Sequence, residues 1–557
     1  MRGGHDASSR LSGDALSGAA LRRRTRALTT PRGLFLAAAL LLCALPVIKD
    51  VRDPDFWWHV RTGELILDRG SLLGTDPYTY TVSSHHWTMH EWLWEVLVAG
   101  LHRVGGLALV VVAVSLVTWA GLVLLYRRAA LRRPHHVALG IGMIVAVVTG
   151  SPIWGPRVQM LTFALTCLVL LVVERHLRGG GRAVWLLVPV FLVWSNLHSG
   201  FVIGAGFIVL VLAAELVAGR LGWRGAAPHD RVVTLIKVLA ACAAVVVLNP
   251  NGPGIYLYPF ETQGSAAQQA LIQEWHSPDF HDASLIPLEL MLLSLAVMVT
   301  VTRTVNARDA VLALATTALA LQSTRHIVLF VAAATPLWVE QADIVGRRIA
   351  AGRRPPGVRA AVASAPVRPP RAARALAWTV LGGLSAGILL TLGTGASTRE
   401  DSLSYARSYP VCATRWLQAS PAGLHIFNQY GEGGYLADKL YSHGDRVFIF
   451  GDAALMGDDM LQRYGAVEDL VPGWEAIIRD SGTDLVLFDA GASLTNLLER
   501  SPRWIRVYQD PYSEAFVPAT EAGQALMARL APQPVFAPSS SDTCAQLQHQ
   551  GAHGTTA

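Results

Sequence analysis

Charged residues are scarce in this sequence of 557 residues. Asp, Glu, Lys and Arg make up 15% of the chain and apolar residues 52%, whereas about 25% of an average soluble domain is charged. This composition excludes an entirely soluble protein. It predicts a membrane protein with enough chain for a large helical bundle and a separate soluble domain.

Cysteine is also scarce, and the basic residues do not gather in one place. Five cysteines are too few for a disulfide scaffold. Cys43, Cys167 and Cys242 lie in apolar runs, where we expect them to be core residues. The net charge of +6 comes from arginines in short loops between apolar runs, so we expect no nucleic-acid partner.

Apolar runs, by contrast, are numerous. Several are shorter than the roughly 20 residues that a lone span needs, but a helix buried among other helices can be shorter. We predict a mostly α-helical polytopic membrane bundle of about 11 transmembrane helices, at 33–48, 107–125, 137–153, 158–173, 184–195, 201–218, 232–248, 285–301, 310–322, 326–339 and 375–392.

The distribution of arginine predicts the orientation of this bundle. Arginine concentrates in the N-terminal segment 1–30, in every second loop, and in the Pro/Arg-rich stretch 346–374, whereas the intervening loops hold few basic residues. Because basic loops stay in the cytoplasm, we expect a cytoplasmic N-terminus, a disordered segment 1–30 and a cytoplasmic linker 346–374. The last span, 375–397, then returns the chain to the outer side of the cell membrane.

Residues 398–557 have the composition of a soluble domain. Strands are predicted at 424–428, 446–450, 484–488 and 504–510, and helices near 433–441, 453–464, 473–481 and 493–500. This alternation is typical of a small α/β domain, which the orientation makes extracytoplasmic, with a disordered tail. Its only cysteines, Cys412 and Cys544, bracket the domain and lie in a compartment that permits a disulfide.

The loops assigned to the outer side contain most of the different polar residue types. The bundle is taken as residues 31–345. Its loop at 50–105, which follows the first span, is the richest in polar residues. Asp53-Pro54 predicts a helix start, with Asp53 as N-cap, and Phe56, Trp57, Val60 and Leu67 would face the membrane interface. Asp55 and His59 share another face. Thr88 and Glu91 have the form of a capping box that opens a second short helix.

These features resemble the GT-C superfamily of membrane glycosyltransferases, and loosely the branch related to protein O-mannosyltransferases and aminoarabinose transferases. Asp53-x-Asp55 stands in the position of the acidic motif that follows the first span, and His90-Glu91 in that of the second short motif. Phe56-Trp57 follow where an Asp-Glu pair is common, and the Lys-Pro-Pro of many relatives is missing.

The resemblance implies an inverting glycosyltransferase that moves a sugar from a polyprenyl-phosphate donor to an unidentified extracytoplasmic acceptor, which is an envelope glycan, a lipid or a protein. A carboxylate would accept the proton of the acceptor, cationic groups would hold the leaving phosphate, and membrane lipid would surround the donor chain. We take Asp55 as the candidate base, with Asp53 as the second catalytic carboxylate. The candidate substrate-binding residues are His59, His90, Glu91, Arg157, His198, Glu274, Asp279, Arg325 and His326.

Simpler roles remain open for several of these residues. Asp53 and Glu91 also suit helix caps, His198 a helix end, and Arg157 and Arg325 interfacial anchors. A divalent cation could bind among Glu274, His276, Asp279, His281 and Asp282, although their spacing matches no standard site. Two other functions stay open: a lipid-handling or transport protein, and a scaffold with an external binding domain.

Overall fold

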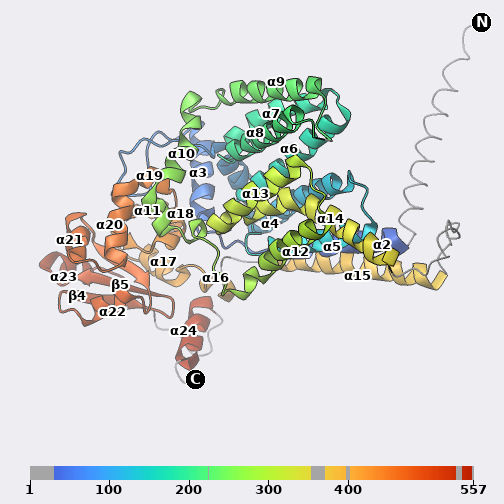
Figure 1. The fold of residues 1–557 in the computed structure, drawn as a ribbon. Helices are drawn as coiled ribbons and strands as arrows, with labels where there is room; N and C mark the ends of the chain where they lie inside the picture. Colours follow the sequence, from blue (N-terminus) through green and yellow to red (C-terminus); the bar gives the residue numbers. More distant parts are fainter. Residues whose placement is uncertain are drawn as a thin grey trace, which may run out of the picture.

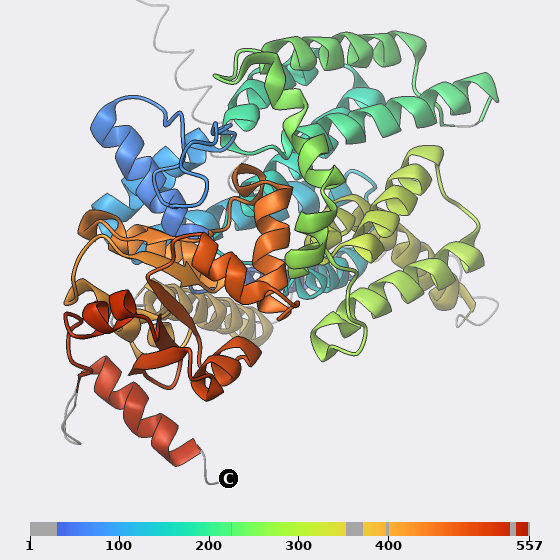
Figure 2. The same ribbon diagram turned by 90° about the vertical axis from the view of Figure 1, so that its left-hand side faces the viewer.

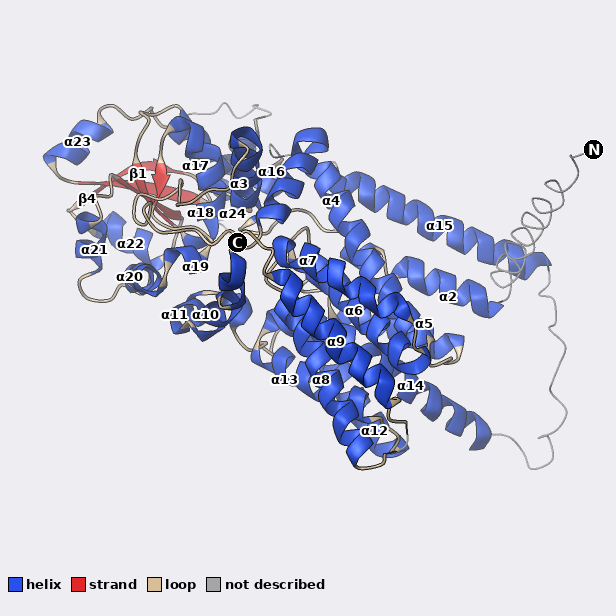
Figure 3. Cartoon of the chain, turned by 90° about the horizontal axis from the view of Figure 1, so that it is seen from above, coloured by secondary structure: helices blue, strands red, loops and turns tan. Residues whose placement is uncertain are grey.

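The computed structural model describes residues 31–223, 225–352, 371–396, 400, 402–534 and 542–554. It places a helical bundle at one end of the molecule and a small mixed sheet, built from the C-terminal region, at the other (Figures 1 and 3). The predictions for residues 1–30 and for most of the 346–374 linker fall outside the described residues.

Each of the predicted apolar runs overlaps a helix, although the runs at 33–48 and 137–153 extend past the helix end. Within the described residues, five helices are long and apolar enough to cross a membrane, the last two together with the short turn before each: α4 (Trp92–Ala130), α6 (Gln159–Gly179), α8 (Phe201–Arg220), α12 (Ile286–Thr302) and α14 (Ile327–Gly352). The remaining runs form α2 (Pro31–Leu42), α5 (His136–Thr149), α7 (Leu187–Leu197), α9 (His229–Val246), α13 (Ala307–Gln322) and α15 (Arg371–Ala396). A multi-pass membrane protein is confirmed, whereas the number of spans stays a prediction.

The loop after α2 contains one separate helix, α3 (Phe56–Arg69), which ends at Gly70 in the left-handed conformation. Its partner is not the short helix that we predicted. Residues from Trp92 onward form the single long helix α4, which bends at Gly105 and Gly106. The two helices pack so closely that a Cβ on Gly63 would lie 1.9 Å from the carbonyl oxygen of Glu95.

A buried group of charged residues ties the C-terminal parts of α4 and α6 to the start of α13 and to the interior of α14. Arg128 Nε donates to Glu174 at 2.7 Å, and Arg132 Nη2 donates to Asp309 at 2.6 Å. Arg128 Nη1 also donates to the carbonyl oxygen of Ala332 at 3.0 Å. That oxygen has no intrahelical donor because Pro336, four residues on, lacks an N–H.

The C-terminal sheet has the strand order β2-β1-β3-β5-β4. The strands β1 (His425–Asn428), β2 (Arg446–Val447) and β3 (Leu485–Asp489) are parallel, and β4 (Trp504–Gln509) and β5 (Ser513–Pro518) pair antiparallel at the other edge. The four predicted strands are confirmed. β5 was missed because its apolar part spans only Ala515–Val517, although its first five residues are buried.

Helices flank this sheet (Figure 2), and the four predicted segments are among them. The run near 453–464 is divided into α19 and α20 by Gly457, which has a positive φ. The tail expected to be disordered contains a helix from Thr543. The helices are α16 (Leu403–Ala406), α17 (Val411–Gln418), α18 (Gly433–Leu440), α19 (Ala453–Met456), α20 (Asp458–Glu468), α21 (Trp474–Asp480), α22 (Ser493–Arg500), α23 (Glu521–Met527) and α24 (Thr543–Gly554).

The C-terminal region covers α3. Trp57 is 0% exposed, its indole N–H donates to the Tyr405 hydroxyl, and Lys439 Nζ lies 3.5 Å from its ring centroid. Arg61 Nε donates to Asp438 at 2.9 Å. The predicted placement of Trp57 at the membrane interface is therefore wrong: protein, not lipid, buries this face, and of the four residues only Leu67 is exposed.

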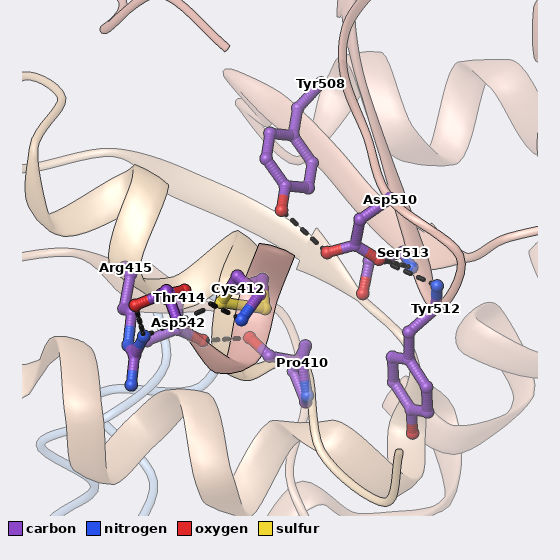
Figure 4. The surroundings of a disulfide bond; sticks show 10 residues. Pro410, Cys412, Thr414, Arg415, Tyr508, Asp510, Tyr512, Ser513 and Asp542 are labelled. Atoms are coloured by element: carbon purple, nitrogen blue, oxygen red, sulfur yellow. Dashed lines mark hydrogen bonds and ion pairs between the residues drawn. A yellow bond between two sulfur atoms is a disulfide. The ribbon is translucent and has the colours of Figure 1, made fainter. Parts of the chain in front are cut away.

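A disulfide joins Cys412 in α17 to Cys544 in α24 (Figure 4). Their Cα atoms are 5.7 Å apart across 132 residues of sequence. The bond attaches α24 to the start of the C-terminal region. Cys43, Cys167 and Cys242 are free and buried, as predicted.

Candidate active site

A cavity of about 730 Å³ lies where α3, the loops at one end of the bundle and the C-terminal region meet. Its wall contains almost every site residue predicted from the sequence. These are Asp53, Asp55, His59, His90, Glu91, Arg157, His198, Glu274, Arg325 and His326. Asp279 is the exception, because it is exposed and pairs with the exposed His281 at 2.9 Å.

Asp55 is the carboxylate that is least committed to structure. It occupies the N-cap position of α3 but makes no capping hydrogen bond. Its Oδ1 accepts from the indole N–H of Trp58 at 3.1 Å, and no Lys or Arg among the described residues forms an ion pair with it. Burial and the neighbouring Asp53 raise the pKa of Asp55 to about 6. It can therefore accept a proton near neutral pH.

Asp53 is held by two groups. Its Oδ2 accepts from Arg157 Nε at 3.1 Å, and its Oδ1 accepts from the backbone N–H of Asp55 at 3.2 Å. The predicted N-cap role of Asp53 is wrong, since the helix begins at Phe56 and Asp55 is the cap residue. Arg157 also donates to Glu274 at 2.6 Å, so two carboxylates neutralise this arginine.

Three histidines surround Glu91. The Nε2 atoms of His90, His198 and His59 lie 3.0, 3.4 and 3.5 Å from its carboxylate oxygens. Glu91 is the residue before α4 and makes no capping hydrogen bond, so the predicted capping box is wrong. All four side chains are buried, and the three imidazoles lie around a single carboxylate.

The charges within this group follow from burial and pairing. Burial raises the pKa of Glu91, but His90 and His198 outweigh it and bring the pKa down to about 2. Burial lowers the pKa of His59, but Glu95 and Glu91 outweigh it and raise the pKa to about 9. A carboxylate and an imidazolium therefore lie side by side in the cavity wall at neutral pH.

His198 is fixed as a neutral side chain. Its Nδ1 accepts from the backbone N–H of Gly200 at 2.9 Å and lies 2.8 Å from Thr162 Oγ1. The ring proton is therefore on Nε2, which faces Glu91. Burial lowers the pKa of His198 to about 4, which keeps the imidazole neutral.

Arg325 is a cation without a carboxylate partner among the described residues. It lines the cavity, and its guanidinium lies 4.9 Å from the ring centroid of Trp275. It stands in the turn before α14, beside His326, whose buried Nδ1 has no hydrogen-bond partner. Of the two predicted arginines, Arg325 is the one free to hold an anion.

The predicted cation ligands do not fit a metal ion as they lie. Glu274 is paired with Arg157, and Asp279 with His281 outside the cavity. Within the described ranges, no group of three or more His, Cys, Asp and Glu side chains is arranged to hold a metal. We derive no step through a metal in this cavity.

Sequence reasoning missed the contribution of the C-terminal region. Gly451 and Asp452 follow β2 and line the cavity, and Asp452 Oδ2 accepts from the Trp87 indole at 2.7 Å. Tyr258 was also missed, although its ring stacks on His90 at 4.0 Å between centroids. The outer loop that carries Tyr258 was recognised as polar, but no spacing in the sequence connects it to His90.

No family model and no curated protein matches the sequence. The fold is similar to that of the oligosaccharyltransferase AglB from Archaeoglobus fulgidus, solved with an inhibitory peptide and a dolichol-phosphate. The TM-score is 0.53 at 9% identity, over 88% of this chain and 77% of that chain.

Two further structures are similar. The apo oligosaccharyltransferase from the same organism gives a TM-score of 0.50 at 10% identity, over 87% of this chain and 74% of that one. ArnT from Cupriavidus metallidurans, bound to undecaprenyl phosphate, gives 0.44 at 14% identity, over 88% and 98% of the two chains. The two oligosaccharyltransferase structures carry the comparison, and at these identities they show the fold alone. The chain therefore has the overall fold of these oligosaccharyltransferase structures, which is consistent with the family that its sequence motifs resemble.

Proposed function

We propose that this protein is an integral membrane inverting glycosyltransferase that takes a sugar from a polyprenyl-phosphate donor to an extracytoplasmic acceptor. One observation carries the proposal. The carboxylate of Asp55, with a pKa of about 6, and the guanidinium of Arg325 line the same cavity, and neither has an ion-pair partner among the described residues. The GT-C fold supports a transferase, and the AglB structure similar to this chain was solved with a polyprenyl phosphate, dolichol-phosphate.

The donor would bind with its phosphate at Arg325. A planar guanidinium forms two parallel hydrogen bonds to phosphate oxygens. The same cavity has an apolar side formed by Val202, Ile203, Leu319, Val328 and Leu329. These residues belong to α8, α13 and α14, so the isoprenoid chain would lie along the bundle.

The reaction needs one base and a stabilised leaving group. Asp55 accepts the proton of the acceptor hydroxyl as its oxygen attacks the anomeric carbon of the sugar. The bond from that carbon to the phosphate oxygen breaks, and polyprenyl phosphate leaves with both bonding electrons. Arg325 neutralises the charge gained by the phosphate. Attack opposite to the leaving group inverts the anomeric carbon, as in inverting glycosidases.

Our proposal puts the chemistry on the outer side of the membrane. Arginine-rich loops mark the inner side, and the disulfide of the C-terminal region suits an oxidising compartment. Single cysteines at the exposed positions Ser84 and Ala522 should react with an impermeant thiol reagent in intact cells, and one at the exposed Ala183 should not. Labelling at Ala183 alone would reverse the orientation.

The buried charges at the opposite end of the bundle argue against the transport alternative. Arg128, Arg132, Glu174 and Asp309 are buried and bind one another. A transporter of alternating access would have to open this end, which would break several buried ion pairs at once.

We further propose the division of the chain that the sequence predicted. Residues 31–345 form the catalytic bundle, 346–374 a cytoplasmic linker, 375–397 the last span and 398–557 the extracytoplasmic α/β domain. The contacts of Trp57, Arg61 and Asp55 with the C-terminal region give that domain a role in completing the cavity.

Asp55→Asn tests the function because it keeps the shape of the side chain and removes its basicity. A deletion strain should lose a glycan or glycosylated product, seen by mass spectrometry of envelope material. Wild-type protein should restore it, and Asp55→Asn should lower turnover about 10²- to 10⁴-fold. Asp279→Asn, at the exposed carboxylate outside the cavity, is the matched control.

Other outcomes have clear meanings. Full complementation by Asp55→Asn would reject the carboxylate mechanism at this loop. Unchanged envelope glycans in the deletion strain would favour the scaffold alternative, in which the C-terminal domain binds a partner. Variant protein must accumulate in the membrane at the wild-type level for either conclusion.

A further inference from the structure

A buried carboxylate lies behind the wall of the cavity. Glu95 stands in the first turn of α4, and its side chain is 2% exposed. It is not one of the residues that line the cavity. The helix α3 packs tightly on this turn, since a Cβ on Gly63 would lie 1.9 Å from the carbonyl oxygen of Glu95. Any part that Glu95 plays in the reaction therefore passes through His59, the cavity residue with which it pairs.

His59 stands between two carboxylates. Its Nδ1 lies 3.7 Å from Glu95 Oε1, and its Nε2 lies 3.5 Å from Glu91 Oε2. A neutral imidazole carries a proton on one nitrogen and a lone pair on the other, so it would turn the lone pair towards one of these carboxylates. Both contacts are attractive only when both nitrogens carry a proton. The geometry therefore favours an imidazolium, in agreement with the raised pKa of His59.

Glu95 differs from Glu91 in having a single partner of opposite charge. Glu91 also pairs with His90 and His198, whereas within the described residues His59 is the only basic side chain that forms an ion pair with Glu95. A buried carboxylate without a cation is costly, so the charges of Glu95 and His59 depend on each other. The remaining titratable groups near this pair are Asp55, Tyr78, His90 and Glu91.

The charge of His59 acts on Asp55. The two residues are one turn apart in α3, and the backbone N–H of His59 donates to the carbonyl oxygen of Asp55 at 3.2 Å. Burial and Asp53 raise the pKa of Asp55, and His59 is the strongest of the groups that lower it. The other charged or titratable groups close to Asp55 are Asp53, Arg157, Arg325, Tyr409 and Tyr430.

We propose that Glu95 is a positioning residue for the candidate base: it holds His59 as an imidazolium, and the charge of His59 keeps Asp55 ionised. Loss of Glu95 would let burial return the imidazole to its neutral form, and Asp55 would then keep its proton to a higher pH. The inference rests on the proposed function only for the role of Asp55 as a base, because the coupling of the three charges belongs to the folded protein itself.

The test reads the ionisation of Asp55 from the stability of full-length protein in detergent. Thermal midpoints of the wild type and of Asp55→Asn are compared over a range of pH, and the pH at which they diverge reports the pKa of Asp55. With Glu95→Gln added to both proteins, the divergence should move up by about 0.5 pH unit or more. Asp68→Asn, at an exposed carboxylate of α3, is the control and should leave it unmoved.

A second pair of proteins shows whether the effect passes through His59. When His59→Gln is present in both, Glu95→Gln should move the divergence no further. Glu95→Asp keeps the charge on a shorter side chain, so it should give a smaller shift of the same sign. This variant also keeps the test available if Glu95→Gln fails to fold.

Two results would overturn the role of Glu95. One is a lower midpoint in Glu95→Gln with an unmoved divergence, which would show that Glu95 serves the fold alone. The other is an undiminished shift in the presence of His59→Gln, which would show that Glu95 acts on Asp55 without the imidazole. A shifted divergence in a protein that transfers no sugar would support the coupling and reject the proposed function instead.

Discussion

The carboxylate of Asp55 lies directly against Gly451. A Cβ on residue 451 would be 1.6 Å from Asp55 Oδ1 and 3.2 Å from the indole nitrogen of Trp58. These residues are about 400 positions apart in the sequence, and only a glycine permits their contact. The C-terminal region therefore determines where the candidate base points.

Gly451→Ala should displace Asp55 and reduce glycosyl transfer. A displacement of about 1 Å at a catalytic group costs on the order of 10²-fold in rate. The φ of Gly451 is not in the left-handed region, so the backbone tolerates alanine and the protein should accumulate normally. Gly465→Ala, where a Cβ meets nothing within 4 Å, is the control and should be fully active.

The pKa of Asp55 predicts opposite effects of Asp55→Asn on stability and on activity. A carboxyl group whose pKa is raised to about 6 costs stability when it is ionised in the folded protein. Asp55→Asn should therefore raise the thermal midpoint above pH 6, with the gain disappearing as the pH falls towards 4. Wild-type activity should decline below about pH 6, where the base becomes protonated. A variant no more stable than wild type at pH 8 would contradict the burial of this charge.

Arg325 should matter for the donor more than Arg157 does. Arg325→Ala should raise the apparent KM for the polyprenyl-phosphate donor, and Arg325→Lys should recover activity only in part, because lysine lacks the bidentate fork. Arg157→Ala should mainly lower stability, since it leaves Asp53 and Glu274 without their cation. Kinetics over a range of donor concentrations distinguish the two, and an unchanged KM in Arg325→Ala would reject the phosphate role.

The disulfide should stabilise the C-terminal region. Cross-links of this kind contribute about 2–4 kcal/mol, and this one closes a loop of 132 residues. Reductant should lower the thermal midpoint of the wild-type protein, and the Cys412→Ser substitution should lower it as well. Cys242 is a free buried cysteine, so the thermal midpoint of Cys242→Ser should respond to reductant as that of the wild type does. Two free thiols at these positions in a non-reduced digest would show that the bond does not form.

Arg128→Ala should destabilise the bundle and leave the cavity lining unchanged. Removing one member of a buried ion pair costs about 3–5 kcal/mol, and Arg128 also supplies the donor that Ala332 lacks because of Pro336. Arg128→Lys should remain well below wild type, because a single ammonium cannot reach both partners in the same geometry. Arg178→Ala, whose side chain is 41% exposed, should shift the midpoint much less.

The sequence determined those features that depend on local pattern. Continuous apolar runs specify helices, since a buried backbone must satisfy its own hydrogen bonds, and each predicted run overlaps a helix. Asp53, Asp55, His59, His90 and Glu91 were recognised because they lie in one short polar loop next to an apolar run. Alternating strands and helices likewise predicted the C-terminal sheet.

Only the tertiary structure decided which of these groups is free to react. Asp53 and Arg157 are 104 residues apart and neutralise each other, whereas Asp55 has no cationic partner among the described residues and faces Gly451. Three histidines reach Glu91 from different segments: His59 from α3, His90 from the position directly before Glu91, and His198 from the loop after α7. Pairing and burial, which set charge and pKa, depend on distances between segments remote in sequence, and no local pattern encodes those distances.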